Sequence, residues 1–96
     1  MPEYPVSKRD LSLVAGGEVT YQAIEKALVN QGGRLLESVQ VFDVYRGDKL
    51  PEGKTAYGVR LKFRSMERTL TDKEIDKIIG KMVTRLQRDL DVALRS

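Results

Sequence analysis

Cysteine, histidine and tryptophan are all absent from the 96 residues. Without cysteine the chain can form neither a disulfide scaffold nor a thiolate metal site, and without histidine it lacks the commonest general base. Carboxylates remain as possible metal ligands, but Asp72, Glu74 and Asp76 fall in the first turn of an expected helix, where the helix dipole already accounts for acidic side chains. We therefore expect no catalytic activity, no metal site and no cofactor in this chain.

Long hydrophobic runs are missing as well, because no apolar stretch approaches the about 20 residues needed to cross a bilayer. Residues 1–5 contain no basic segment followed by an apolar one, so a secretory signal is not expected. The 41% hydrophobic and 32% charged residues are typical of a soluble globular protein. We expect a cytoplasmic protein without membrane association. The net charge of +3 leans only modestly towards a polyanionic partner.

The length corresponds to one domain, which should bury roughly two-thirds of its unfolded surface. Two of the three prolines lie within residues 1–7, and Tyr4-Pro5 favours an extended backbone. We therefore predict a lead-in or linker remnant over residues 1–7 and a folded domain over residues 8–96.

Alternation of apolar and polar residues predicts strands over residues 8–14, 35–45 and 55–64, with a short closing strand near Val92 and Leu94. Two helices are expected between them. Thr20 is a good N-cap for the first, which should stop at Gly32-Gly33. The pair Thr71 and Glu74 forms a capping box for the second, whose apolar stripe continues for about five turns. The order strand, helix, strand, strand, helix, strand predicts an α+β, ferredoxin-like sandwich: an antiparallel sheet with both helices on one face.

The strand over residues 55–64 alternates most strictly. Its apolar residues should face the helices, and its charged residues Arg60, Lys62 and Arg64 should lie on the open face. Three cations about 6.5 to 7 Å apart match the phosphate spacing of a single nucleic-acid strand. The same pattern also fits an ordinary solvated strand face, and the sequence leaves both interpretations open.

In the segment Phe42-Asp43-Val44-Tyr45-Arg46-Gly47 the alternation changes phase. Val39 and Val41 have one parity, whereas the next two apolar residues have the other. A β-bulge at residue 41 or 42 would keep all four apolar side chains on the helix side and turn Asp43 and Tyr45 outward. An outward tyrosine can stack on an unpaired base, and a carboxylate can accept hydrogen bonds from guanine. The alternative is that Tyr45 folds over the edge of the core and Asp43 starts a turn.

Several blocks carry a family resemblance, in this order: Arg9-Asp10-Leu11-Ser12-Leu13-Val14, Leu36-Glu37-Ser38-Val39, Phe42-Asp43-Val44-Tyr45-Arg46-Gly47, Leu50-Pro51-Glu52-Gly53-Lys54, Phe63-Arg64, and Arg68-Thr69-Leu70-Thr71-Asp72 with Glu74. Together they resemble the ferredoxin-fold anticodon-binding domain that closes the β subunit of bacterial phenylalanyl-tRNA synthetases. The resemblance extends over roughly residues 4–95.

This resemblance implies that the open sheet face holds the anticodon stem-loop of phenylalanine tRNA. The first anticodon base, a guanine, would stack on Tyr45 and hydrogen-bond to Asp43. Thr55 and Ala56 fall where the family approaches that base, and since alanine has no hydroxyl, a side-chain hydrogen bond would come from Thr55. The RNA backbone contacts implied by the resemblance are Arg9, Arg60, Lys62 and Arg64.

The resemblance also implies that the chain is one part of an α2β2 synthetase, with the remainder of the β subunit and the α subunit as partners. Aminoacylation with ATP and Mg²⁺ would then belong to other domains. One rival is a ferredoxin-like regulatory domain that binds a small molecule, for which we expect a dimer and an apolar interface pocket. An acyl-phosphate hydrolase would need a phosphate cradle, which Gly16-Gly17-Glu18 does not offer. A copper chaperone is excluded by the missing cysteines.

Overall fold

The computed structural model describes residues 4–95, which form two helices, four strands and one 3₁₀ turn. The predicted order of elements is confirmed, and the bounds are β1 Ser7–Gly16, α1 Tyr21–Gly32, the 3₁₀ turn Gly33–Leu35, β2 Leu36–Tyr45, β3 Lys54–Phe63, α2 Asp72–Leu90 and β4 Ala93–Leu94. Residues 1–3 of the predicted lead-in and Ser96 lie outside the described residues, and Ser7 already belongs to β1. The division between lead-in and domain stays a prediction.

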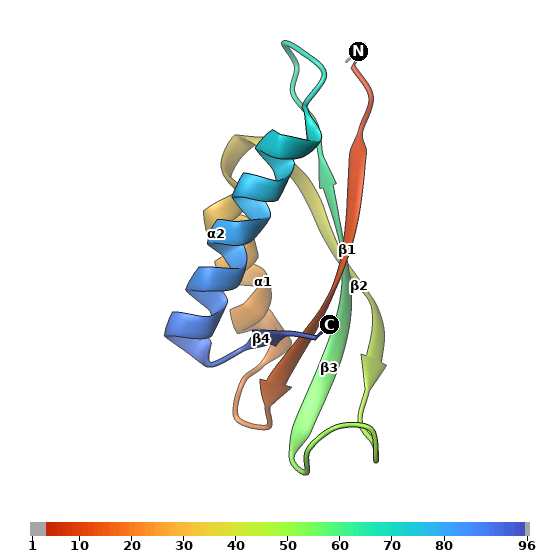
Figure 1. The fold of residues 1–96 in the computed structure, drawn as a ribbon, viewed down its shortest axis with the longest axis vertical. Helices are drawn as coiled ribbons and strands as arrows, with labels where there is room; N and C mark the ends of the chain where they lie inside the picture. Colours follow the sequence, from red (N-terminus) through yellow and green to blue (C-terminus); the bar gives the residue numbers. More distant parts are fainter. Residues whose placement is uncertain (1–3, 96) are drawn as a thin grey trace.

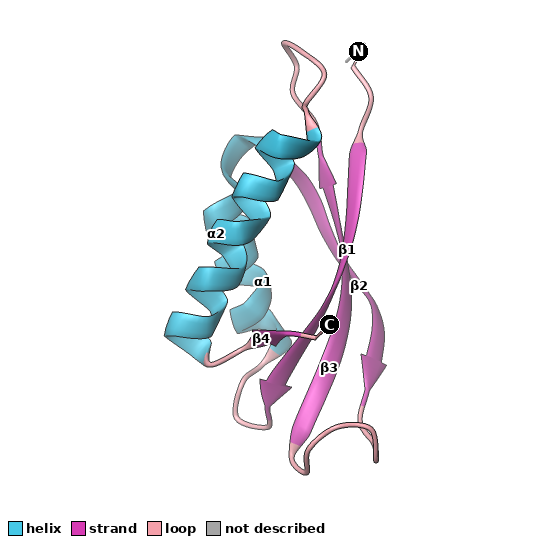
Figure 2. Ribbon diagram, in the orientation of Figure 1, coloured by secondary structure: helices cyan, strands magenta, loops and turns pink. Residues whose placement is uncertain are grey.

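The strands form one sheet in the order β2-β3-β1-β4, and every neighbouring pair is antiparallel. Both helices cover the same face of this sheet, and the opposite face is left without a covering layer (Figure 1). Figure 2 shows the two layers, with the helices on one side and the strands on the other. This arrangement confirms the predicted ferredoxin-like α+β sandwich.

The helix ends follow the predicted capping residues. The Thr20 hydroxyl accepts a hydrogen bond from the Ala23 N–H at 3.2 Å, and α1 stops before Gly33, whose φ of 61° lies in the left-handed region that favours glycine. At the start of α2, the Thr71 hydroxyl accepts from the Glu74 N–H at 3.1 Å, and the Glu74 carboxylate accepts from the Thr71 N–H at 2.9 Å. Both caps satisfy amides that have no partner inside the helix.

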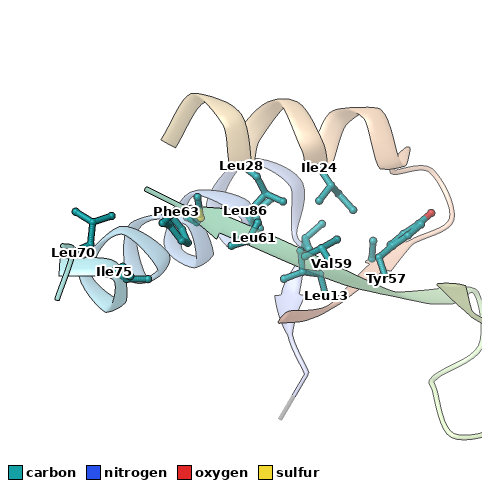
Figure 3. Packing of buried hydrophobic residues seen from close by; sticks show 13 residues of the cluster. Leu13, Ile24, Leu28, Tyr57, Val59, Leu61, Phe63, Leu70, Ile75 and Leu86 are labelled. Carbon is teal, nitrogen blue, oxygen red and sulfur yellow. The ribbon is translucent and has the colours of Figure 1, made fainter. Parts of the chain in front are cut away.

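The hydrophobic core lies between the helices and one face of the sheet (Figure 3). The sheet contributes side chains of a single parity, and they meet side chains from both helices. The fully buried members from the strands are Leu13, Ala15, Val59, Leu61 and Phe63, and those from the helices are Ile24, Leu28, Ile75, Met82 and Leu86. The predicted helix-facing parity of the strands is confirmed, so the opposite parity is left on the open face.

Strand β2 contains the predicted bulge, but its consequence differs from the expectation. Val41 lies opposite Val59 and Asp43 lies opposite Gly58, so Phe42 is the extra residue. The expectation that Phe42 stays on the helix side is wrong: a Cβ added at Gly58, which would point to the open face, would come within 3.1 Å of the Phe42 ring. Val44 keeps the helix-side register opposite Tyr57, yet it is 49% exposed because β2 is the edge strand.

A second irregularity, which we did not predict, lies between Leu36 and Ser38 of the same strand. It makes Glu37 the extra residue, so the helix-facing parity of β2 changes twice along its length. The apolar pair Leu35-Leu36 hides this change in the sequence, because it offers an apolar side chain to either parity.

Candidate nucleic-acid interface

The open face of the sheet is assembled by register across three strands. On β3 and β1, Arg60 lies opposite Asp10, and Lys62 lies opposite Lys8. On β2, the bulge places Asp43 opposite Gly58 and Tyr45 opposite Ala56 (strands labelled in Figure 1). The open face therefore carries aromatic, acidic and basic side chains, and the two residues of β3 opposite Asp43 and Tyr45 are small.

Tyr45 is the last residue of β2 and lies opposite Ala56 of β3. Its register partner Ala56 is only 3% exposed, so the small side chain at this position is covered by its neighbours. The Tyr45 hydroxyl donates to Asp48 Oδ1 at 3.3 Å, and a Cβ added at Gly47 would come within 2.5 Å of the hydroxyl oxygen. Tyr45 thus lies on the open face, as expected, rather than over the helix-side core.

Arg95 is the second side chain near the Tyr45 ring, and sequence reasoning missed it. Its backbone N–H donates to the Ser12 carbonyl oxygen at 2.8 Å, which holds the end of the chain against β1. From there its guanidinium carbon lies 5.9 Å from the centroid of the Tyr45 ring, within the range of a cation–π contact. A single arginine after a two-residue strand gives no sequence signal for this placement.

Asp43 is exposed on the same face, and none of the ion pairs within residues 4–95 involves it. Its Cβ would lie 3.2 Å from a Cβ added at Gly58, so the missing side chain of that glycine leaves room for the acid. Both carboxylate oxygens of Asp43 are therefore available as hydrogen-bond acceptors.

Arg60 is not a free cation. Its Nε and Nη2 donate to the two carboxylate oxygens of Asp10 at 2.9 and 3.0 Å, and its guanidinium carbon lies 5.1 Å from the centroid of the Phe42 ring. The hydrogen bonds from Arg60 hold the pKa of the Asp10 carboxyl below its ordinary value, and the same contact raises the pKa of Arg60. The pair fixes the plane of the guanidinium while neutralising most of its charge.

The predicted row of three cations is thus only partly available. Arg64 Nε lies 3.3 Å from Glu37 Oε1, so this arginine is also paired. Lys62 takes part in no ion pair within residues 4–95, and neither does its register partner Lys8, which sequence reasoning did not single out. The unneutralised positive charge on this part of the face comes from these two lysines on adjacent strands.

Two other predicted site residues lie away from the open face. Arg9 is in register with the buried Leu61, and its Nη2 lies 2.8 Å from Asp72 Oδ1 at the start of α2. Thr55 is buried opposite Ala15, and its hydroxyl accepts a hydrogen bond from Arg46 Nε at 3.1 Å. The parity of the strands separates both residues from Tyr45 and Asp43.

The described residues also form a hollow outside the open face. A cleft of about 390 Å³ lies between the turn after β1 and the loop after β2, with Arg46, Lys54 and Glu52 in its lining. Among residues 4–95 no three acidic side chains gather in the way a metal ion would require. Neither of the helices in this range is long and apolar enough to cross a membrane.

Comparison with known proteins gives one consistent result. The family model of the ferredoxin-fold anticodon-binding domain matches residues 2–95. The chain is 41% identical over 95 residues to the phenylalanine–tRNA ligase β subunit of Clostridium tetani, and 41% identical over 93 residues to that of Trichormus variabilis. It is 40% identical over 95 residues to that of Porphyromonas gingivalis. These alignments cover 97% to 99% of this chain but 12% of each relative, so the chain spans about an eighth of the length of the curated relatives it matches.

Proposed function

Because the chain belongs to the family of ferredoxin-fold anticodon-binding domains, we propose that it is the anticodon-binding domain of a phenylalanine–tRNA ligase β subunit. In this proposal it holds the anticodon stem-loop of phenylalanine tRNA on the open face of the sheet. The observation that carries the proposal is the joint placement of the exposed Asp43 and the half-buried Tyr45 in the open-face register of β2.

Tyr45 supplies stacking, which is worth about 1 to 3 kcal/mol per base and is tolerant of base identity, since every base has an aromatic face. Asp43 supplies selectivity. A carboxylate has only acceptors, so it matches the ring N–H and amino group of guanine and repels bases that present acceptors there. The two side chains are two residues apart on one strand, so one nucleotide can meet both.

The RNA backbone would be held by Lys62 and Lys8, with the fixed guanidinium of Arg60 as a hydrogen-bond donor through its remaining N–H groups. Arg64 stays a candidate backbone contact, weakened by its pairing with Glu37. We do not include Arg9, because its pairing with Asp72 directs it to the helix layer. Binding through two unpaired lysines should weaken as salt rises.

The chain would act by positioning rather than by chemistry. Contacts to the anticodon would help to place the distant acceptor end of the tRNA at the catalytic site of the cytoplasmic synthetase. ATP and Mg²⁺ would be bound by other domains of that enzyme, and the structural partners of this domain would be the rest of the β subunit and the α subunit.

The test is a titration of the chain with a phenylalanine-tRNA anticodon stem-loop carrying G or C at the first anticodon position, followed by backbone amide shifts at low salt. We expect shifts around Asp43, Tyr45 and Arg60 that weaken with the C variant. Tyr45→Ala should cost about 1 to 3 kcal/mol of binding. Asp43→Asn should reduce the preference for G.

The matched control is Asp76→Asn, which removes the same charge from the exposed side of α2. It should leave both affinity and base preference unchanged. If the shifts are indifferent to the base and to Tyr45→Ala, the open face is only a basic surface and the proposal fails.

A further inference from the structure

Phe42 is an exposed aromatic ring that the proposed function does not yet use. The chain has two phenylalanines, and they have opposite environments: Phe63 is fully buried in the core, whereas Phe42 is 51% exposed on the open face. A single exposed apolar side chain is common on protein surfaces and by itself indicates nothing. The Phe42 ring differs from such a side chain because its neighbours hold it in a defined position.

The ring of Phe42 is held in place from two sides. The absence of a side chain at Gly58 provides the space for the edge of the ring, since an added Cβ would come within 3.1 Å of the ring atom Cζ. The guanidinium of Arg60 lies over the ring at 5.1 Å, and that guanidinium is itself fixed by two hydrogen bonds to Asp10. A ring so restrained loses little conformational freedom when it binds a partner.

The bulge sets the relation of this ring to Tyr45. The extra residue puts Phe42 and Asp43 on the same side, both against Gly58, and Tyr45 follows on that side two residues later. Strand β2 therefore presents a phenyl ring, a carboxylate and a phenol ring in sequence along one face. Sheets that bind single-stranded RNA use successive aromatic rings to stack successive bases.

We propose that Phe42 is a second stacking platform, on which lies the base of an unpaired nucleotide adjacent to the one stacked on Tyr45. This inference rests on the proposed function. The phenyl ring has no polar atom, so it stacks on any base and adds affinity without base preference. Arg60 keeps the ring in place and offers its free N–H groups to the phosphate between the two nucleotides.

The experiment uses the chain bound to the same anticodon stem-loop. Selective ¹³C labelling of phenylalanine gives two ring signals, of which the buried Phe63 is the internal reference. We expect nuclear Overhauser contacts from Phe42 ring protons to the base next to the one that contacts Tyr45. Phe42→Leu keeps an apolar side chain but removes the aromatic face, and it should weaken binding about 5- to 150-fold with the preference for G retained.

Val44→Ala is the matched control, because it shortens an equally exposed apolar side chain of β2 that lies on the opposite register. It should change the affinity by no more than about twofold. If Tyr45 contacts a base while Phe42 contacts none and Phe42→Leu binds normally, the second platform is excluded and the proposed function stands. A loss in Phe42→Ala that Phe42→Leu restores would also overturn the inference, because the ring would then only support Arg60. Absence of base contacts at both rings would overturn the proposed function as well.

Discussion

The two faces of the sheet are made by alternate residues of the same strands, yet they differ in almost every physical property. On β3, Leu61 is fully buried under the helices, whereas the adjacent Arg60 and Lys62 lie on the open face with one paired and one unpaired charge. Burial of apolar surface on the helix side supplies the stability of the fold. The open face contributes little to that stability and is left to interact with a partner, so substitutions one residue apart should have separable effects.

The largest test of this contrast compares the two phenylalanines. Phe63→Ala should lower the free energy of unfolding by about 3 to 5 kcal/mol, because it leaves a cavity in the core. Phe42→Ala should lower it by less than about 1 kcal/mol, because half of that ring is already in water. Urea denaturation of both variants measures the difference. Similar losses would mean that the open face also holds the fold together.

A smaller effect is expected at the cap of α2, which belongs to the helix layer. Thr71→Ala removes the acceptor for the Glu74 N–H and should cost about 1 kcal/mol of unfolding free energy. Thr84→Ala, at an exposed position within the same helix, is the control and should not destabilise the protein. Binding of the stem-loop by the folded Thr71→Ala protein should be unchanged. A weakened interaction would show that the two layers are coupled.

A third difference between the layers appears only in alkali. Burial of the Tyr21 hydroxyl on the helix side raises its pKa to about 12, and the charge of Glu25 adds to the shift. The neutral phenol is favoured in the folded protein, so this contribution to stability is full below pH 10 and is lost as the pH rises towards 12. We expect the stability difference between the wild type and Tyr21→Phe to change over that window in urea denaturation. A constant difference from pH 9 to 12 would contradict it.

The smallest expected effect is on the titration of Asp10, which pairs with Arg60 on the open face. The hydrogen bonds from Arg60 lower the pKa of Asp10, so the carboxyl should titrate below its ordinary value of 3.8. The stabilisation from this pair is present above that value and is lost as the pH falls through the lowered pKa. In Arg60→Gln the midpoint, followed by carboxyl ¹³C shifts, should rise towards 3.8. A midpoint that stays low would assign the shift to other groups.

The sequence predicted most of the fold because local chemistry and tertiary packing agree in this chain. Thr20 and Thr71 cap the helices, and the alternation from Tyr57 to Phe63 sets the helix-facing side of β3. The prediction weakened at β2, where the bulged residue was expected inside. An apolar side chain at a bulge can turn to either face, and the space above Gly58, which comes from another strand, decides which one.

For the candidate site, the sequence predicted which residues lie on the open face better than it predicted which of them form ion pairs. Strand parity placed Lys62 on the open face, and the expected bulge placed Asp43 and Tyr45 there, as the structure has them. Parity did not show that Arg60 and Arg64 are paired, since their acids come from different strands. The contact of Arg95 with Tyr45 depends on how a two-residue strand docks, which no local pattern specifies.

The bulge at Phe42 makes the binding face sensitive to insertions and deletions in the gene. One residue is three nucleotides, so an in-frame deletion of the Phe42 codon would remove the bulge and restore the regular alternation of β2, with Asp43 and Tyr45 still on the open face. The insertion of one codon after Phe42, taken up by the strand without a second bulge, would turn Asp43 and Tyr45 towards the helices without changing either amino acid. The length of this segment is therefore as much a determinant of the binding face as its composition, and gapped positions in related genes carry functional information that substitutions alone would miss.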